Sequence, residues 1–372
     1  MSMKKLISIT LALVMCVCSM SFCISANAAQ AKTVAITLKG TMYGGIVDAA
    51  VNSVNESREY YGLQTLTVDK NLTAIAEKRA AEIMLYADTT NDSRPDGSDI
   101  TSLISDYGVY SDTIFGTMYD TDSSSLEYKI SDFKYNYNSL QSIGVGVFGY
   151  KGSYAYYVVV STKAPTAKAT CTTRSQSYTV NVATSKFTKK YIEYTAKNGG
   201  RYSALSTKFY AGGVYSDYTT IPNAQLAYAS SNSKVFKIKG YNGYAKKNGK
   251  FTVTSKLKDG TVICKDSRNY TGYNTVKPVI KSISTPKKGK LKITWTTNIT
   301  DVEGYQIQYS TNKQFKKGNK TVIVKGKKSS AKTIAKLKSK KIYYVRIRGF
   351  INQGNGEKAY TNWSKAKNIK VK

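Results

Sequence analysis

The chain has 372 residues, enough for two or three domains, and its 56 Lys and Arg exceed its 23 Asp and Glu to give a net charge of +33. It contains no histidine. That absence excludes Ser-His-Asp catalysis, Cys-His catalysis and every metal site that uses an imidazole ligand.

The positive charge is concentrated toward the C-terminus. Residues 32–164 carry a net charge of −5, and residues 165–276 carry +14. Residues 277–372 carry 25 Lys and Arg against 3 Asp and Glu, a net charge of +22. A mildly acidic first part followed by a strongly basic end indicates a polyanion as the partner of that end.

The first 28 residues have the pattern of a secretion signal. Lys4 and Lys5 precede an apolar run over residues 6–24, and Ala26-Asn27-Ala28 provides small residues for cleavage. We therefore expect a signal peptide over residues 1–28 and a secreted, extracellular protein. No later stretch is long and apolar enough to span a bilayer, so no transmembrane segment is expected after the signal is removed.

Cys171 and Cys264 are the two cysteines that follow the predicted signal. An even pair in an oxidising compartment favours a disulfide, which would contribute about 4 kcal/mol by restricting the unfolded chain. The alternative is two separate buried thiols, because the sequence does not give the distance between them.

Helix signals come first in residues 44–164. Apolar residues recur with helical spacing over residues 46–61, and Gly62 is suited to end that helix. Asp69 is a candidate N-cap for a second helix. Residues 94–97, Arg-Pro-Asp-Gly, form a turn signal, and a short helix is expected to follow it.

Strand signals come last in the same region. Residues 143–147 and residues 154–161 are predicted to be two strands joined by a turn. Helices followed by a hairpin indicate an α+β domain.

The order of these motifs resembles the CAP superfamily of SCP-like extracellular domains. The resemblance rests on Val54-Asn55-Glu56-Ser57-Arg58, Gly62-Leu63, Asp69, Arg79-Ala80, Glu82, the Arg94–Gly97 turn and the strand at residues 143–146. It covers residues 44–164 and implies an α-β-α sandwich.

The departures from the family concern its metal tetrad. Asp92 stands where metal-binding members have a histidine, and Asp112 most nearly corresponds to a family glutamate. The resemblance therefore implies a scaffold without the tetrad, and we expect no metal and no cofactor. The remaining candidates for a ligand cleft are Asp92, Arg94, Asp96 and Asp112.

Each of these candidates has a structural alternative. The aspartates could gather to hold Ca²⁺ or Mg²⁺ or act as an acid–base pair, or Asp92 and Asp96 could simply hydrogen-bond the turn. Arg94 could hold an anionic ligand or pair with a neighbouring aspartate.

Residues 165–275 contain short alternating strands rich in Tyr, Val and Thr. Tyr178-Val180-Val182 and Phe251-Val253 are examples, and turns separate them at intervals of about ten residues. This pattern predicts a β-sandwich with a loose resemblance to bacterial Ig-like repeats.

Residues 277–372 resemble a fibronectin type III domain. Residues 290–295 form an alternating strand that ends in Trp295, and residues 343–348 resemble the strand of a tyrosine corner with Tyr343 as the corner residue. Alternation places Tyr343, Val345 and Ile347 inward.

The densest basic region of the chain lies in this last domain. Its candidate polyanion-binding residues are Lys313, Lys316, Lys317, Lys325, Lys327, Lys328, Lys340 and Lys341. The sequence thus predicts a multidomain, surface-associated binding protein, with an acidic cell-wall polymer or glycan, or a host or bacterial surface protein, as its partner. No specific nucleic-acid partner is expected, because no recognition motif is present. The sequence favours a binding protein over an enzyme. The alternative to the binding protein is a divergent SCP-like hydrolase that uses carboxylates.

Overall fold

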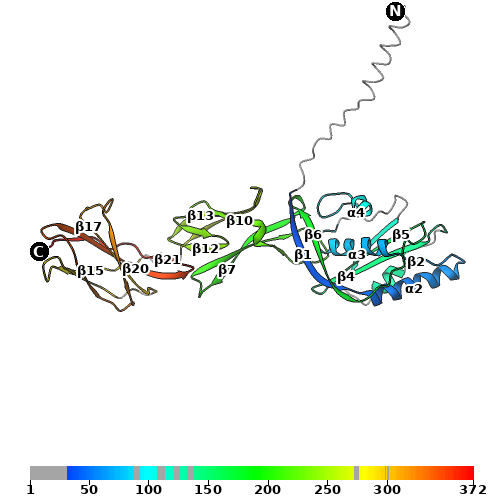
Figure 1. Ribbon diagram of the computed structural model, residues 1–372, viewed down its shortest axis with the longest axis horizontal. Helices are drawn as coiled ribbons and strands as arrows, with labels where there is room; N and C mark the ends of the chain where they lie inside the picture. The colour runs from blue at the N-terminus through cyan, green and yellow to red at the C-terminus, as the bar shows by residue number, and fades with distance from the viewer. Residues whose placement is uncertain are drawn as a thin grey trace, which may run out of the picture. The chain divides into compact units, whose positions relative to one another are not determined.

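The structure, a computed structural model, describes most of the chain after the predicted signal. The described residues are 32–87, 93–106, 114–120, 126–131, 138–271, 276–297, 299 and 301–372. The predicted signal peptide, residues 1–28, lies outside them. The chain forms two compact units, called here the head unit (residues 1–187 with 211–216) and the tail unit (residues 188–210 with 217–372). The fold is multidomain and mostly β-sheet, with its α-helices near the N-terminus (Figure 1).

The head unit is built on a six-stranded sheet. Its strands lie in the order β3, β5, β4, β1, β6 with antiparallel neighbours, and the short β2 pairs parallel to β4. The bounds are β1 Thr33–Met42, β2 Thr67–Val68, β3 Ile114–Asp120, β4 Ser142–Tyr150, β5 Ser153–Ser161 and β6 Arg174–Ala183. The predicted hairpin is therefore confirmed as β4 and β5.

This sheet extends past both predicted boundaries of the first domain, residues 44–164. β1 precedes that range and β6 follows it, and the two pair along their whole lengths. The predicted strand around Tyr178 exists, but it belongs to the head sheet and not to the following sandwich. The pairing joins residues 142 positions apart, as at Thr37 and Thr179, and no local sequence pattern reveals such a partner.

The helices of the head unit are α2 Gly44–Tyr60, α3 Lys70–Leu85, α4 Thr101–Asp106 and α5 Leu126–Ser131. The end of α2 and the start of α3 lie at the predicted signals. Gly62 follows α2 with φ +68°, as a helix-terminating glycine does. Asp69 caps α3 by accepting hydrogen bonds from the backbone N–H groups of Asn71 and Leu72. Both predictions are confirmed.

The second oxygen of Asp69 fixes the segment that leaves the hairpin. It accepts hydrogen bonds from the backbone N–H of Thr166 (2.6 Å) and from its hydroxyl (2.8 Å). Burial tends to raise the pKa of this carboxyl, but the hydrogen bonds to its charged form outweigh burial and hold the pKa below its ordinary value.

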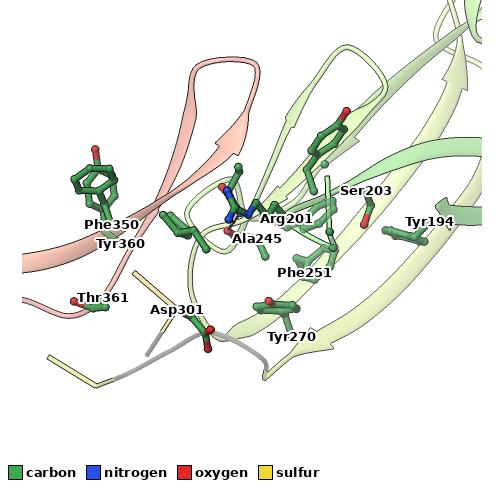
Figure 2. Close-up of a pocket in the computed structure, with 18 of the residues that line it drawn as sticks. Tyr194, Arg201, Ser203, Ala245, Phe251, Tyr270, Asp301, Phe350, Tyr360 and Thr361 are labelled. Atoms are coloured by element: carbon green, nitrogen blue, oxygen red, sulfur yellow. Dashed lines mark hydrogen bonds between the residues drawn. The ribbon is translucent and has the colours of Figure 1, made fainter. Parts of the chain in front are cut away.

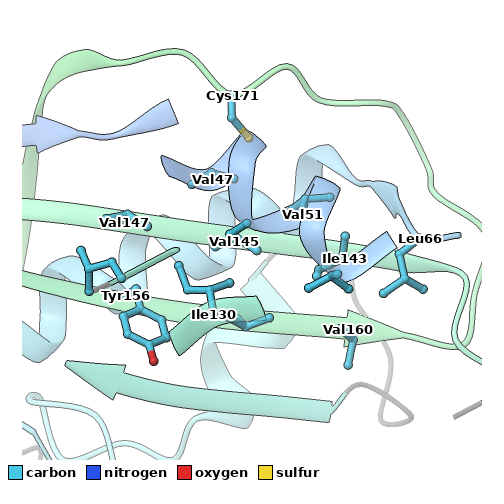
Figure 3. Close-up of a cluster of buried hydrophobic side chains, with 14 of the residues drawn as sticks. Val47, Val51, Leu66, Ile130, Ile143, Val145, Val147, Tyr156, Val160 and Cys171 are labelled. Atoms are coloured by element: carbon cyan, nitrogen blue, oxygen red, sulfur yellow. The ribbon is translucent and has the colours of Figure 1, made fainter. Parts of the chain in front are cut away.

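Helices cover both faces of β4. Ile143, Val145 and Val147 point to one face, where they share a core with the α2 residues Val47 and Val51 (Figure 3). The intervening residues point to the other face, where α3 packs against β4 and β5. The head is therefore an α+β unit.

Two glycines on β4 let α3 approach the sheet closely. A Cβ on Gly144 would lie 2.1 Å from the carbonyl carbon of Leu72, and one on Gly146 would lie 2.3 Å from the backbone nitrogen of Glu77. Neither contact leaves room for a side chain, and the obstacle is helix backbone. The spacing between helix and sheet thus depends on the glycines at these two positions.

The first part of the tail unit contains a five-stranded and a three-stranded sheet. The five-stranded sheet has the order β11-β12-β8-β7 with β9 beside β8, and the three-stranded sheet has the order β10-β13-β14. Phe236 and Phe251 stack between the sheets with centroids 4.4 Å apart. The bounds are β7 Lys189–Lys197, β8 Tyr202–Tyr210, β9 Thr219–Ile221, β10 Leu226–Ser230, β11 Phe236–Lys239, β12 Asn242–Ala245, β13 Gly249–Leu257 and β14 Val262–Tyr270.

The last part of the tail unit is a second pair of sheets. One has the order β15-β16-β19, and the other has the order β18-β17-β20-β21 with β22 beside β20. The bounds are β15 Ile280–Ser284, β16 Leu291–Trp295, β17 Gly304–Ser310, β18 Lys320–Lys325, β19 Ala331–Ile334, β20 Ile342–Gly354, β21 Glu357–Tyr360 and β22 Lys367–Lys370.

The predicted alternation along β20 is confirmed. Tyr343, Val345 and Ile347 are buried, and Trp295 joins them in the core at 1% exposure. The Tyr343 hydroxyl accepts a hydrogen bond from the backbone N–H of Lys338 (3.2 Å), five residues upstream.

Both cysteines are free thiols, so the predicted disulfide is absent. Cys171 is buried in the core of the head unit, and Cys264 lies half-buried on β14 of the tail unit. Each sulfur is held by the packing of its own unit. Among the described residues, no helix has the length and apolar character needed to cross a membrane.

Substitution of the β4 glycines tests the close approach of α3. Gly146→Ala should lower the free energy of unfolding by about 3 kcal/mol, because the new methyl group meets helix backbone. Chemical denaturation of the purified protein measures this change. Gly45→Ala is the matched control: nothing lies within 4 Å of its added Cβ, and Ala in a helix is favoured over Gly by up to about 1 kcal/mol. Equal effects of the two substitutions would contradict the account.

Candidate functional site

The predicted turn at residues 94–97 is present and is closed by its own hydrogen bonds. The backbone N–H of Gly97 donates to the Arg94 carbonyl (3.0 Å), and Gly97 has φ +90°. One carboxylate oxygen of Asp96 accepts from the backbone N–H (2.9 Å) and the hydroxyl (2.6 Å) of Ser98. Of the two roles considered for Asp96, the structure shows the hydrogen bonding that stabilises the turn.

Arg94 is bound to a glutamate of α3. Its guanidinium donates to both oxygens of Glu82, with Nη2–Oε1 at 2.6 Å, and to the Ser102 hydroxyl at 2.8 Å. Arg94 is 7% exposed and Glu82 is 3% exposed. The buried pair leaves the Arg94 guanidinium engaged within the protein, which weakens its candidacy as a ligand-binding group.

A second arginine shares the same carboxylate. Arg79, which is fully buried, donates from Nη1 to Glu82 Oε2 (3.3 Å) and from Nη2 to the Ser93 carbonyl (3.2 Å). Two guanidinium groups on one buried carboxylate join α3 to the turn. We call Arg79, Glu82 and Arg94 the buried ion cluster.

The structure brings together only part of the predicted cleft. Asp92 and Asp112 lie outside the described residues, and Arg94 and Asp96 are engaged by the fold. Within the described part of the chain, no group of three or more acidic residues, cysteines or histidines is placed to hold a metal ion. The sequence signal for the buried ion cluster was the presence of Arg79 and Glu82, two charged residues three positions apart, among the apolar residues of α3.

The cysteine of the head core is not suited to nucleophilic catalysis. Burial, with smaller contributions from nearby carboxylates, raises the pKa of the Cys171 thiol to about 11. The thiol is therefore protonated at neutral pH, whereas nucleophilic cysteines are thiolates.

The tail unit contains a cavity of about 670 Å³ whose lining combines aromatic rings with polar and charged side chains (Figure 2). Its rings are Tyr194, Tyr202, Phe236, Phe251, Tyr270, Phe350 and Tyr360. Its two arginines are already paired. Arg201 binds Glu303, and Arg268 binds Asp266 (2.7 Å) while it lies 3.7 Å from the centroid of the Tyr194 ring. The cavity offers aromatic surface to a ligand, but its cations are occupied.

Glu357 binds two lysines of the tail unit. Its oxygens accept hydrogen bonds from Lys246 Nζ (2.8 Å) and Lys237 Nζ (2.9 Å). The hydrogen bonds from Lys246 and then Lys237 lower the pKa of the Glu357 carboxyl to about 2. Burial lowers the pKa of Lys246, and the ion pair with Glu357 opposes that shift.

The candidate polyanion-binding lysines are exposed and lie on one continuous stretch of chain. Residues 313–341 contain twelve lysines and no acidic residue. They follow the loop after β17, the edge strand β18, the edge strand β19 and the loop before β20. All eight predicted residues are exposed, and none of the twelve ammonium groups forms an ion pair with any described residue. We call residues 313–341 the lysine surface.

The comparison with family models matches one part of the chain. Residues 51–162 match the family model described as "CAP: Cysteine-rich secretory protein family". The comparison with curated proteins returns no match.

Solved structures similar to part of this chain include two fibronectin type III domains. The fn3 domain of human collagen alpha-1(XX) chain is 16% identical, with 27% of this chain and 89% of that chain covered and a TM-score of 0.22. The fn3 domain of human contactin 1 is 14% identical, with 27% and 82% covered and a TM-score of 0.23. A structure titled "Myokine structure" is 16% identical, with 26% and 98% covered and a TM-score of 0.21.

Removal of the shared carboxylate tests the buried ion cluster. Glu82→Gln removes the carboxylate that the two buried guanidinium groups share, and we expect the free energy of unfolding to fall by about 3–5 kcal/mol. Thermal and urea denaturation measure the loss. Glu56→Gln on the exposed face of α2 removes the same charge and should change stability by less than about 0.5 kcal/mol. A Glu82→Gln protein as stable as this control would exclude the structural role.

The Glu357 ion pairs predict a pH dependence of tail stability. Because the folded-state pKa lies below the ordinary value near 4.5, the stabilisation is complete above that pH and is lost as the pH falls toward 2. Glu357→Gln should therefore destabilise the tail unit by roughly 1–2 kcal/mol at neutral pH and by much less at about pH 2. Urea unfolding at both pH values, followed by tryptophan fluorescence, measures the difference. A pH-independent effect would show that the charge of Glu357 contributes nothing.

Proposed function

We propose that this protein is a secreted, surface-associated binding protein whose lysine surface attaches it to an acidic cell-wall polymer or glycan. The observation that carries the proposal is the set of twelve exposed lysines over residues 313–341, with no acidic residue among them and no ion pair to a described residue. Such a surface attracts polyanions over a distance set by the ionic strength.

The type of cation favours loose attachment to a polymer. The lysine surface contains no arginine. An ammonium group is a hydrated point charge on a flexible stem, whereas a guanidinium group forms a fixed fork that suits bidentate recognition. Many lysines on two edge strands and their loops can therefore follow an irregular chain of phosphates or carboxylates without a single binding geometry.

Solubility alone is a weaker explanation of this surface. Lysines on edge strands do prevent sheets from pairing with one another. Two edge strands, β18 and β19, need only a few charges for that purpose, whereas residues 277–372 carry a net charge of +22. Repulsion on that scale works against the compact state, so an external polyanion accounts better for the number of lysines.

The secreted location is part of the same proposal. It is supported by the signal-like pattern of residues 1–28 and by the match of residues 51–162 to a family of secretory proteins. Attachment to the wall and a second partner among host or bacterial surface proteins are proposed on charge alone.

We also infer the finer fold of each domain. An α-β-α sandwich of the CAP type for the head is supported by helices on both faces of β4. A fibronectin type III domain over residues 277–372 is supported by the buried Trp295 and by the hydrogen bond from Lys338 to the Tyr343 hydroxyl. Two packed sheets support the Ig-like proposal for the sandwich between them.

The alternative of a carboxylate-dependent hydrolase depends on Asp92 and Asp112. With Arg94 and Asp96 engaged by the fold, these two residues are what remains of the predicted cleft. If the native protein turns over a substrate and Asp92→Ala or Asp112→Ala abolishes that turnover, the result favours the hydrolase over the binding protein.

Substitution of the lysine surface tests the proposed function. Six exposed lysines are replaced by glutamine: Lys313, Lys316, Lys317, Lys325, Lys327 and Lys328. Because the attraction is electrostatic, binding to isolated cell walls that carry anionic polymer should fall by about tenfold or more at low salt. Sedimentation with the walls measures the bound fraction.

The control for this experiment removes the same charge from another part of the tail unit. It replaces six other exposed lysines by glutamine: Lys189, Lys190, Lys234, Lys247, Lys250 and Lys258. We expect this variant to keep most of its binding. Equal losses in both variants would mean that net charge, and not the lysine surface, determines attachment.

A further inference from the structure

A groove of about 350 Å³ lies in the head unit beside the turn between β4 and β5. It is formed where the end of β1 meets the β4–β5 turn, at the register of Thr41 with Gly149. The Arg94–Gly97 turn contacts the other end of β6, since the Ala183 N–H donates to the Pro95 carbonyl. Ala183 pairs with Thr33 of β1, and Thr33 lies eight residues, or about 26 Å, from Thr41 along the strand. The groove is thus distinct from the predicted cleft.

Two glycines of the groove lie in close contact with neighbouring rings and backbone. A Cβ on Gly40 would lie 2.3 Å from the Gly149 carbonyl oxygen, and a Cβ on Gly149 would lie 2.6 Å from the Tyr43 ring. Both positions therefore have to be glycine for the strands and the ring to meet as they do. The glycines thus let the Phe148 and Tyr43 rings pack directly against the strand backbone, which sets the position of Tyr43 beside the groove.

Tyrosines provide the walls. Tyr43 and Tyr154 form a tilted pair with centroids 5.6 Å apart. Tyr150 also lines the groove, and behind it Tyr215, which is not a lining residue, meets the Tyr150 ring edge to face at 5.2 Å. Tyr215 comes from the segment 211–216, which is held in the head unit by hydrogen bonds from Val214 to the Ile83 carbonyl (3.0 Å) and from Tyr215 to the Met84 carbonyl (3.1 Å).

A lysine is held among these rings by an unusual turn. Lys151 has φ +50° and Gly152 has φ +81°, a two-residue turn in which Asn or Gly is the usual first residue. The Lys151 ammonium lies 5.1 Å from the centroids of both Tyr150 and Tyr215 and donates to the Tyr215 hydroxyl (3.3 Å). A strained position occupied by a charged residue is evidence for a role of that residue.

The groove is basic although the head domain is acidic. Lys39 also lines it, and none of its lining residues is acidic, whereas residues 32–164 carry a net charge of −5. Burial would lower the pKa of Lys151, but its interactions with the two tyrosines outweigh burial and raise it. The ammonium group is therefore charged at neutral pH and available to an anion.

We propose that this groove binds a short carboxylated saccharide. A sugar ring has an apolar face that packs on tyrosine rings, hydroxyl groups that bond to the hydroxyls of Thr41 and Ser175, and a carboxylate that pairs with Lys151 and Lys39. The volume lies at the small end of the range for ligand pockets, so it accommodates no more than about two sugar rings. This site is in the head unit and does not depend on the lysine surface.

Calorimetric titration of the full secreted chain tests this site. The probes are disaccharides of glucuronate, galacturonate and N-acetylmuramate, each paired with its neutral counterpart of glucose, galactose or N-acetylglucosamine. We expect at least one carboxylated disaccharide to bind about tenfold or more tightly than its neutral counterpart. Absence of binding by all three, or equal binding of the neutral counterparts, would overturn the proposal.

A matched pair of variants assigns the binding to the groove. Lys151→Asn removes the ammonium group and suits the positive φ of the turn, so the head should stay folded while affinity falls about tenfold. Lys168→Asn removes one exposed positive charge of the head elsewhere and should leave affinity unchanged. Unchanged binding by Lys151→Asn would overturn the assignment. The six-lysine variant of the tail should bind the disaccharide normally, which separates this site from attachment through the lysine surface.

Discussion

Positive charge that is not balanced within its own domain is the constraint on which the rest of the structure depends. Residues 277–372 contain only three acidic residues, and two of them, Glu303 and Glu357, already bind cations of residues 188–271. The remaining cations repel one another, and this repulsion works against the compact state. The apolar core around Trp295 has to hold the sandwich together against it. A polyanion would supply the missing negative charge, which connects the fold to attachment at a surface.

The head unit balances its buried charges internally. Glu82 lies between Arg79 and Arg94, and this cluster engages the guanidinium that the turn at residues 94–97 would otherwise present to a ligand. An exposed ammonium group lies at the other end of β1, where Lys151 contacts the rings of Tyr150 and Tyr215. An acidic saccharide in the head and an acidic polymer on the tail would both be found at a bacterial surface, although each site stands on its own observations.

Local patterns in the sequence predicted local structure well. The two-residue alternation of a strand gives the inward residues of β20. The capping preference of aspartate gives the start of α3 at Asp69, and the tolerance of glycine for positive φ gives the end of α2. Each of these signals depends on a few neighbouring residues. Long-range partners could not be predicted in this way. The pairing of β6 with β1 and the binding of Glu82 by Arg94 depend on how distant segments pack. The sequence also did not show that Cys171 and Cys264 belong to different units. Tyr215 contacts Tyr150 and Lys151 from a segment that follows β6 in sequence.

The salt dependence of attachment tests the central claim most directly. Full-length protein is titrated onto cell walls that carry anionic polymer, and onto the same walls stripped of it, between about 0.05 and about 0.5 M salt. If uncompensated lysines cause attachment, affinity should fall steeply as screening increases, and the stripped walls should retain little protein at any salt concentration. Affinity that does not change with salt, or equal binding to stripped walls, would contradict the account.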